Sequence, residues 1–138
     1  MQYASAKELH ARFGVTLVQT IDGDDPAKSA LVKRALDDAT AEVNSYLQGR
    51  FVLPLPFIPP VLTQVAADIA IYRLLVLRPD QTVEDARKRY EDARKRLTEI
   101  RKGELDLGLP LSKSPAIVGQ VQITSATRLF DRRSLRDA

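Results

Sequence analysis

Apolar residues recur at three- and four-residue intervals from Pro26 to Gln48, which is the spacing of an amphipathic helix. Asp25 directly precedes Pro26, and this order is typical of a helix start, with Asp at the N-cap and Pro at the first helical position. Gly49 supplies the stop. The positions expected to face a core are Leu31, Val32, Ala35, Leu36, Ala39, Val43, Tyr46 and Leu47.

A shorter helix is predicted near the start of the chain. Ser5 and Glu8 have the spacing of a capping box, in which each side chain satisfies a free backbone N–H of the other residue. We expect this helix to run to about Phe13 and to end at Gly14.

Two more helices follow, and they differ in how their apolar residues are distributed. From Pro60 to the residues before Pro79 the chain is apolar nearly all round, so this helix is expected to be the most buried. Thr82 and Asp85 repeat the capping-box spacing at the start of a helix that runs to Lys102 with one narrow apolar stripe. Together the four segments predict an all-α fold, a small bundle of about four helices.

Between the long helices lies a proline-rich connection. The segment Arg50–Pro60 contains four prolines among large apolar residues, so it cannot be a helix and suits a central strand poorly. We predict an extended crossing whose buried side chains are Phe51, Leu53, Leu55 and Phe57.

After Gly103 no helix of useful length is visible. The sequence therefore predicts two parts, a helical domain over residues 1–103 and an extended C-terminal arm over residues 104–138. We expect the arm either to be ordered by a partner or to stay mobile. Deletion of the arm after Gly103 is expected to leave a folded domain.

Composition excludes much catalytic chemistry. The 138 residues include no Cys, no Trp, one Met and one His, which rules out disulfides, a thiolate nucleophile, a Cys-bearing zinc site and a multi-His metal site. The start of the chain does not have the pattern of a secretory signal, and charged residues interrupt the apolar stretch Val61–Leu77. We expect a protein made in the cytoplasm, with no membrane span, no cofactor and no enzymatic activity.

Asp68 and His10 are the side chains that merit a test against catalysis. Asp68 sits among apolar residues, so it is either a general base with a raised pKa or a structural carboxylate that bonds Tyr72 or an Arg, or that faces a neighbouring subunit. The structural interpretation is favoured because no second carboxylate or nucleophile accompanies it at a catalytic spacing. His10 lacks an orienting partner in the sequence and is also interpreted as structural.

The fourth predicted helix carries two basic triplets seven residues apart. One interpretation is a nucleic-acid-binding module built on residues 84–102, whose affinity would fall steeply with salt. The favoured one is a solvated helix or a charged subunit interface, because acidic residues are interleaved with the basic ones. The six candidate residues are Arg87, Lys88, Arg89, Arg94, Lys95 and Arg96.

Near the end of the chain, Arg side chains alternate with large apolar ones. Phe fills pockets and Arg makes bidentate contacts to carboxylates, so both residue types anchor protein interfaces. The predicted partner-binding residues are Arg128, Leu129, Phe130, Arg132, Arg133, Leu135 and Arg136.

The order and spacing of several short motifs resemble the Mu-like phage head-tail connector family. The motifs are Tyr3-Ala4, Arg12-Phe13-Gly14, Tyr46-Leu47-Gln48-Gly49-Arg50-Phe51, Leu53-Pro54-Leu55, Asp68-Ile69-Ala70, Tyr72-Arg73-Leu74, Arg89-Tyr90-Glu91-Asp92-Ala93 and Arg128-Leu129-Phe130-Asp131-Arg132-Arg133-Ser134-Leu135. The family is similar in size and helical plan to the adaptor proteins of long-tailed phages.

This resemblance implies a structural virion protein at the head-tail junction, made in the host cytoplasm. Its implied partners are the portal protein, neighbouring adaptor subunits in a ring of about twelve copies, and a tail or stopper protein. DNA would pass through the channel of the ring without sequence-specific contacts.

Overall fold

The computed structural model describes three stretches of the chain, residues 1–14, 26–78 and 83–112. They form four α-helices, α1 (Ala6–Phe13), α3 (Pro26–Leu47), α4 (Pro60–Val76) and α5 (Glu84–Lys102). Within these stretches the β pairing is limited to one isolated antiparallel bridge, between Phe51 and Leu111. The all-α prediction is confirmed.

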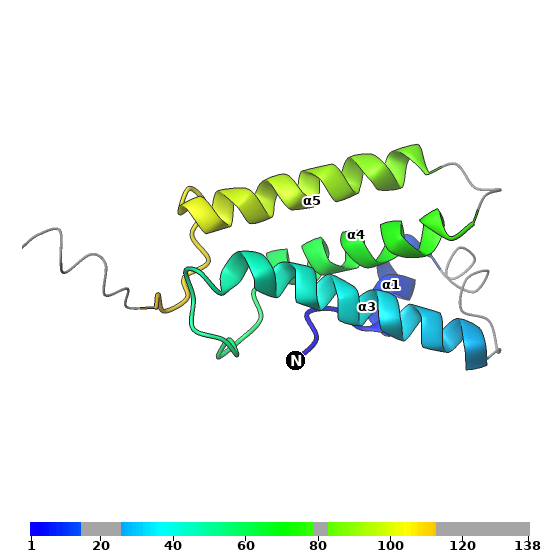
Figure 1. Ribbon diagram of the computed structural model, residues 1–138, viewed down its shortest axis with the longest axis horizontal. Coiled ribbons are helices and arrows are strands. Elements are labelled where there is room, and N and C mark those ends of the chain that lie inside the picture. Colours follow the sequence, from blue (N-terminus) through cyan, green and yellow to red (C-terminus); the bar gives the residue numbers. More distant parts are fainter. Residues whose placement is uncertain (15–25, 79–82, 113–138) are drawn as a thin grey trace, which may run out of the picture.

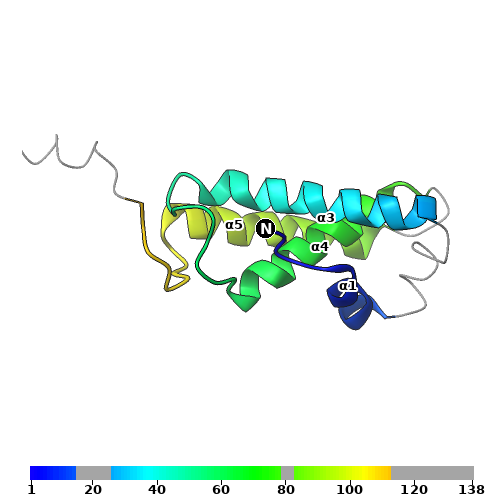
Figure 2. The same ribbon diagram turned by 90° about the horizontal axis from the view of Figure 1, so that it is seen from below.

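Helices α3, α4 and α5 lie along the long axis of the molecule, each antiparallel to the one before it (Figure 1). Helix α4 packs against both of the others, and α3 also contacts α5. The short α1 lies against α3 and α4 to one side of this layer (Figure 2). As predicted, Ser5 caps α1, because its Oγ accepts a hydrogen bond from the Glu8 N–H at 3.3 Å. The predicted N-cap of α3, Asp25, lies outside the described residues.

Helix α4 supplies much of the core, as its all-round apolar pattern predicts. A helix that lies between two others buries both faces, and α4 therefore has buried side chains on successive positions rather than along one stripe. They are Leu62, Val65, Ala66, Ala67, Ile69, Ala70, Ile71, Leu74 and Leu75. The narrow stripe of α5 packs onto this core through Ala86, Ala93, Leu97 and Ile100.

Three local predictions are wrong. In the proline-rich crossing Phe51 and Leu55 are buried, but Phe57 is 53% exposed, because bends interrupt the two-residue alternation that an extended strand would keep. Leu31 of α3 is 42% exposed. Helix α5 begins at Glu84 with Val83 at its N-cap and no side-chain cap, and Thr82 lies outside the described residues.

Arg50 joins the end of α3 to the end of α5. Its guanidinium donates hydrogen bonds to the carbonyl oxygens of Ile100 and Leu105, and it lies 5.1 Å from the centre of the Phe51 ring. Gly103 ends α5 with a left-handed conformation at φ 86°. A cation at a helix C-terminus is favourable because the last carbonyl groups have no partner within the helix.

The same residue fastens the first part of the predicted arm. The backbone carbonyl of Arg50 accepts hydrogen bonds from the Ser112 N–H at 2.9 Å and from the Ser112 hydroxyl at 3.2 Å. Leu109 is buried, and Leu105 and Leu107 pack against the core. Residues 104–112 therefore contact the helical domain. The rest of the predicted arm lies outside the described residues.

We expect Arg50→Met to lower the free energy of unfolding by about 2 kcal/mol, because hydrogen bonds from a charged donor are lost at a helix end. Urea-induced unfolding measured by circular dichroism tests this. Lys102→Met, at an exposed position nearby, is the matched control and should change the free energy by less than about 0.5 kcal/mol. Equal effects of the two substitutions would contradict the role assigned to Arg50.

Candidate functional site

Glu42 is the polar junction of the three long helices. Its carboxylate accepts a hydrogen bond from Arg73 of α4 at 2.9 Å and another from the Tyr90 hydroxyl of α5 at 2.9 Å. The Tyr90 ring stacks on Tyr72 with centroids 4.5 Å apart. Burial, and then the hydrogen bond to Glu42, raises the pKa of Tyr90 above its ordinary value. This cluster holds the helices together and contains no nucleophile.

Sequence reasoning missed Glu42. It named Tyr72, Arg73 and Tyr90 in motifs, but it did not single out Glu42. An Arg on an otherwise apolar helix was a signal that a partner must exist, since charges that leave water are normally paired. It did not say which of the acidic residues on α3 was the partner.

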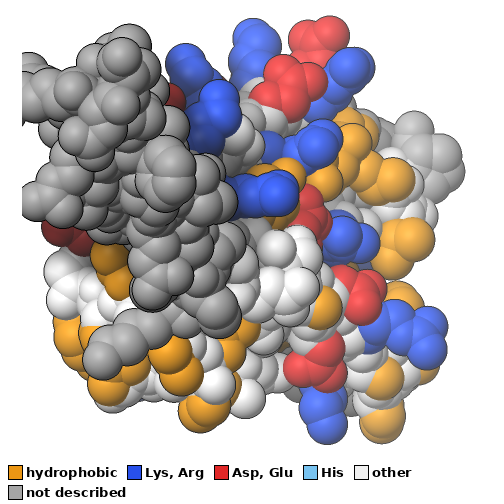
Figure 3. All heavy atoms as spheres, turned by 60° about the vertical axis from the view of Figure 1, so that its left-hand side comes forward, with side chains coloured by type: hydrophobic (Ala, Val, Ile, Leu, Met, Phe, Trp, Pro, Cys, Tyr) orange, Lys and Arg blue, Asp and Glu red, His pale blue; other side chains and the backbone are white. Residues whose placement is uncertain are grey.

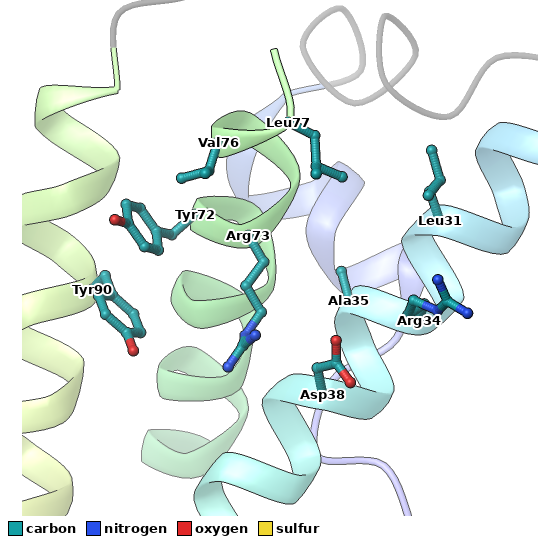
Figure 4. A pocket seen from close by; sticks show the side chains of 9 residues that line it. All are labelled: Leu31, Arg34, Ala35, Asp38, Tyr72, Arg73, Val76, Leu77 and Tyr90. Atoms are coloured by element: carbon teal, nitrogen blue, oxygen red, sulfur yellow. The ribbon is translucent and has the colours of Figure 1, made fainter. Parts of the chain in front are cut away.

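Beside this junction lies an apolar groove of about 410 Å³ between α3 and α4, with Tyr90 of α5 on its wall. Figure 4 shows its lining residues. They are Leu31, Arg34, Ala35, Asp38, Tyr72, Arg73, Val76, Leu77 and Tyr90. Three large aliphatic side chains are uncovered here, with Leu31 42%, Val76 54% and Leu77 63% exposed. These three side chains form an uncovered apolar surface beside the Glu42 junction.

One polar atom on the wall of the groove lacks a partner. The Nε atom of Arg73 is buried and makes no hydrogen bond, although the same guanidinium pairs with Glu42 through Nη2. A buried donor without an acceptor costs about 1–3 kcal/mol. An acceptor brought by a bound chain could remove part of this cost after a small movement of the side chain.

A second hollow, of about 380 Å³, is polar and lies between α1, α4 and α5. We call it the polar hollow, and it is lined by Arg12, Phe13, Gln64, Asp68, Arg89, Asp92, Ala93 and Arg96. Burial raises the pKa of Asp68 above its ordinary value, while Arg89, Arg96 and Arg12 oppose the shift. The structure thus brings Asp92 near Asp68, which the sequence spacing had not indicated.

The six cations of the two triplets are all exposed, but they do not form one uniform ridge. Successive residues of a helix point about 100° apart, so each triplet is spread around α5. Arg87 pairs with Glu91 at 3.2 Å. Arg89 lies 5.4 Å from the Phe13 ring centre and Arg94 lies 5.8 Å from that of Tyr90.

Figure 3 shows Lys and Arg side chains spread from the top to the bottom of one face, with acidic side chains among them. Lys88 and Lys95 are exposed on α5. Mixed charge of this kind fits a solvated or subunit-facing helix better than a phosphate-binding ridge.

The structure also bears on the other functional residues and sites considered from the sequence. His10 lies on α1 and is partly buried. In the described stretches no group of three or more His, Cys, Asp or Glu side chains could hold a metal ion. No helix among these residues is long and apolar enough to cross a membrane. The predicted partner-binding residues, from Arg128 to Arg136, lie outside the described residues.

Comparison with known proteins matches the chain to phage sequences over most of its length. The family model described as "Bacteriophage Mu, Gp36" matches residues 3–124. The Mu-like prophage FluMu protein gp36 of Haemophilus influenzae is 36% identical over 110 residues, which cover 78% of this chain and 76% of that protein. Gene product J of Escherichia phage Mu is 30% identical over 139 aligned positions, with 96% of each chain covered.

The raised pKa of Asp68 predicts how stability depends on pH. A carboxyl group whose pKa is higher in the folded state contributes stability below its ordinary value of 3.8 and loses that contribution as the pH rises through the folded value. Asp68→Asn should therefore raise the melting temperature at pH 7, and this gain should shrink as the pH falls from the raised folded pKa toward 3.8 and be absent below that pH.

Thermal unfolding followed by circular dichroism at several pH values tests this expectation. Asp92→Asn, at an exposed position of the same polar hollow, is the matched control and should change the melting temperature little. A lower melting temperature for Asp68→Asn at pH 7 would show that attraction to the arginines outweighs burial.

Proposed function

Because this chain belongs to the bacteriophage Mu Gp36 family and is thus a phage-associated protein, we propose that it is a structural virion protein that joins the head to the tail. In this role it is an adaptor and not an enzyme. It forms a ring of about twelve copies on the portal protein, and the ring continues the DNA channel toward a tail or stopper protein.

The apolar groove is the observation that carries the proposal. It lies beside a hydrogen-bond network that connects the three long helices. Arg73 and Tyr90 both donate hydrogen bonds to Glu42, so these three side chains link the helices to one another. Next to them, Val76 and Leu77 expose apolar side chains to water, and contact with another protein would bury this surface. Uncovered apolar surface beside a rigid helical core supports a role in assembly.

The C-terminal residues provide a second contact in the proposed ring. Arg128, Phe130 and Arg133 are of the types that anchor interfaces, and they follow the last described residue, Ser112, after a stretch without a predicted helix. In the proposed ring this segment grips the portal or a neighbouring adaptor. Heterologous contacts of this kind, between different surfaces of identical subunits, generate closed rings when the rotation between subunits allows.

Helix α5 provides a further proposed contact, either with a neighbouring subunit or with the DNA in the channel. Its exposed cations, with acidic residues between them, lie at the interface between subunits or on the wall of the channel. Mixed charge on a channel wall lets DNA slide without a fixed register, because no cluster of cations holds a phosphate in place. The DNA passes without sequence-specific contacts.

Truncation after Ser112 tests the adaptor role. The cut belongs here and not after Gly103, because Leu109 is buried and Ser112 bonds Arg50. We expect the truncated protein to keep its helical circular dichroism and cooperative unfolding but to fail to join heads to tails in an in vitro complementation assay. Full-length protein added to the same extract is the control. Normal joining by the truncated protein would overturn the proposed role of the arm.

A salt titration of DNA binding separates the adaptor from the nucleic-acid-binding module. We expect no measurable binding of a labelled duplex near 150 mM salt by fluorescence anisotropy, because acidic residues such as Glu91 offset the cations of α5. A Lys88→Glu, Lys95→Glu variant should behave in the same way. Tight binding that weakens steeply with salt, and that this variant loses, would favour the alternative function.

A further inference from the structure

The apolar groove and the point where the described chain ends lie at opposite ends of the bundle. The groove lies along the first half of α3, at Leu31 and Asp38. Ser112 is bonded to Arg50, just beyond the last turn of α3. Figure 1 shows the two ends of this helix at opposite sides of the molecule.

The groove has an apolar floor and a rim that carries both signs of charge. Val76, Leu77 and the stacked tyrosines provide the apolar surface. Arg34 and Asp38 stand on the rim (Figure 4). A fitting ligand is a short chain with adjacent large apolar side chains flanked by an anion and a cation.

Residues 128–132 of this same chain have that pattern. Arg128 precedes the apolar pair Leu129 and Phe130, and Asp131 and Arg132 follow it. With the apolar pair in the groove, Asp131 complements Arg34, and the flanking arginines complement Asp38. A backbone carbonyl of the segment is also an acceptor of the kind that the buried Nε of Arg73 lacks.

The chain is long enough for this contact. From Ser112 to Arg128 an extended backbone spans about 50 Å at roughly 3.3 Å per residue. Helix α3 is about 33 Å long at roughly 1.5 Å per residue. The segment can thus reach a groove on an adjoining subunit.

We propose that the apolar groove binds residues 128–132 of a second copy of this chain, with Leu129 and Phe130 in the groove. This inference rests on the proposed ring and names the receiving site for its arm. We assign the groove to a second copy because heterologous contacts between copies build the proposed ring. The same length of chain also reaches the segment's own groove, and the double variant described below separates the two cases.

Disulfide trapping between two single-cysteine proteins tests the contact, and it is clean because the chain has no cysteine of its own. Full-length Leu77→Cys and Leu129→Cys proteins are mixed under mild oxidation. We expect the heterodimer to form at least tenfold faster than with Val52→Cys in place of Leu77→Cys, since Val52 is similarly exposed but lies away from the groove. Equal rates would overturn the proposal.

A double variant with both cysteines decides whether one copy or two form the contact. Covalent dimers and longer chains on a non-reducing gel support binding between copies. Monomers that have lost both thiols would show that the segment folds back onto its own groove, and would overturn the assignment to a second copy.

A second measurement does not depend on oxidation. Leu77→Asp blocks the groove and Phe130→Asp blocks the segment, so each variant should be monomeric in sedimentation at concentrations where the wild type self-associates. Their equimolar mixture retains one intact groove and one intact segment and should give a one-to-one dimer. A wild type that stays monomeric at the highest concentration reached, or a mixture that stays monomeric, would contradict the proposal.

Failure here and failure of the adaptor role give different results. If the adaptor role fails, the purified protein still forms the trapped heterodimer while truncation after Ser112 leaves head-tail joining intact. If the groove assignment fails, truncation abolishes joining but the heterodimer does not form above the rate of the Val52→Cys control.

Discussion

The hydrogen bonds of the Arg50 guanidinium connect the C-terminal end of α3 to the C-terminal end of α5. One side chain satisfies carbonyl groups at the C-terminus of α5, while its own backbone carbonyl binds Ser112. The end of α3, the end of α5 and the segment that follows α5 are thereby fixed at one point. Without this point the carbonyls at the end of α5 would need water, and residues 104–112 would lose the hydrogen bonds of Ser112. Ser112 is therefore held beside the end of α3. This position matters for any role in which the residues after 112 bind a partner.

The core between these ends depends on the position of α4 between α3 and α5. Glu42, Arg73 and Tyr90 link the three helices by hydrogen bonds, so the layer cannot shift without breaking a partly buried ion pair. The two hollows of the bundle, the apolar groove and the polar hollow, differ in the side chains that line them. The groove on one side is apolar, whereas the polar hollow around Asp68 is lined by arginines from two helices.

These properties suit a building block of an assembly. Among the described residues, the Glu42 carboxylate is bonded to Arg73 and Tyr90, and Asp68 lies in a hollow lined by arginines. The surface meanwhile combines uncovered aliphatic side chains with interleaved acidic and basic residues on α5, where the basic ones are in excess. Membership of a phage protein family agrees with this division between a fixed interior and contact surfaces on the outside.

The four helices, the buried character of α4 and the family could all be predicted from the sequence, because helix periodicity, caps and motif order are local properties. The meeting of particular polar residues could not be predicted in this way. Glu42 is one of several acids on α3, and nothing local selects it as the partner of Arg73. Phe57 and Leu31 have the composition of core residues, and only the bends of the crossing and the path of α3 leave them exposed. Contacts between distant segments depend on how helices are placed in space, which periodicity along the chain does not encode.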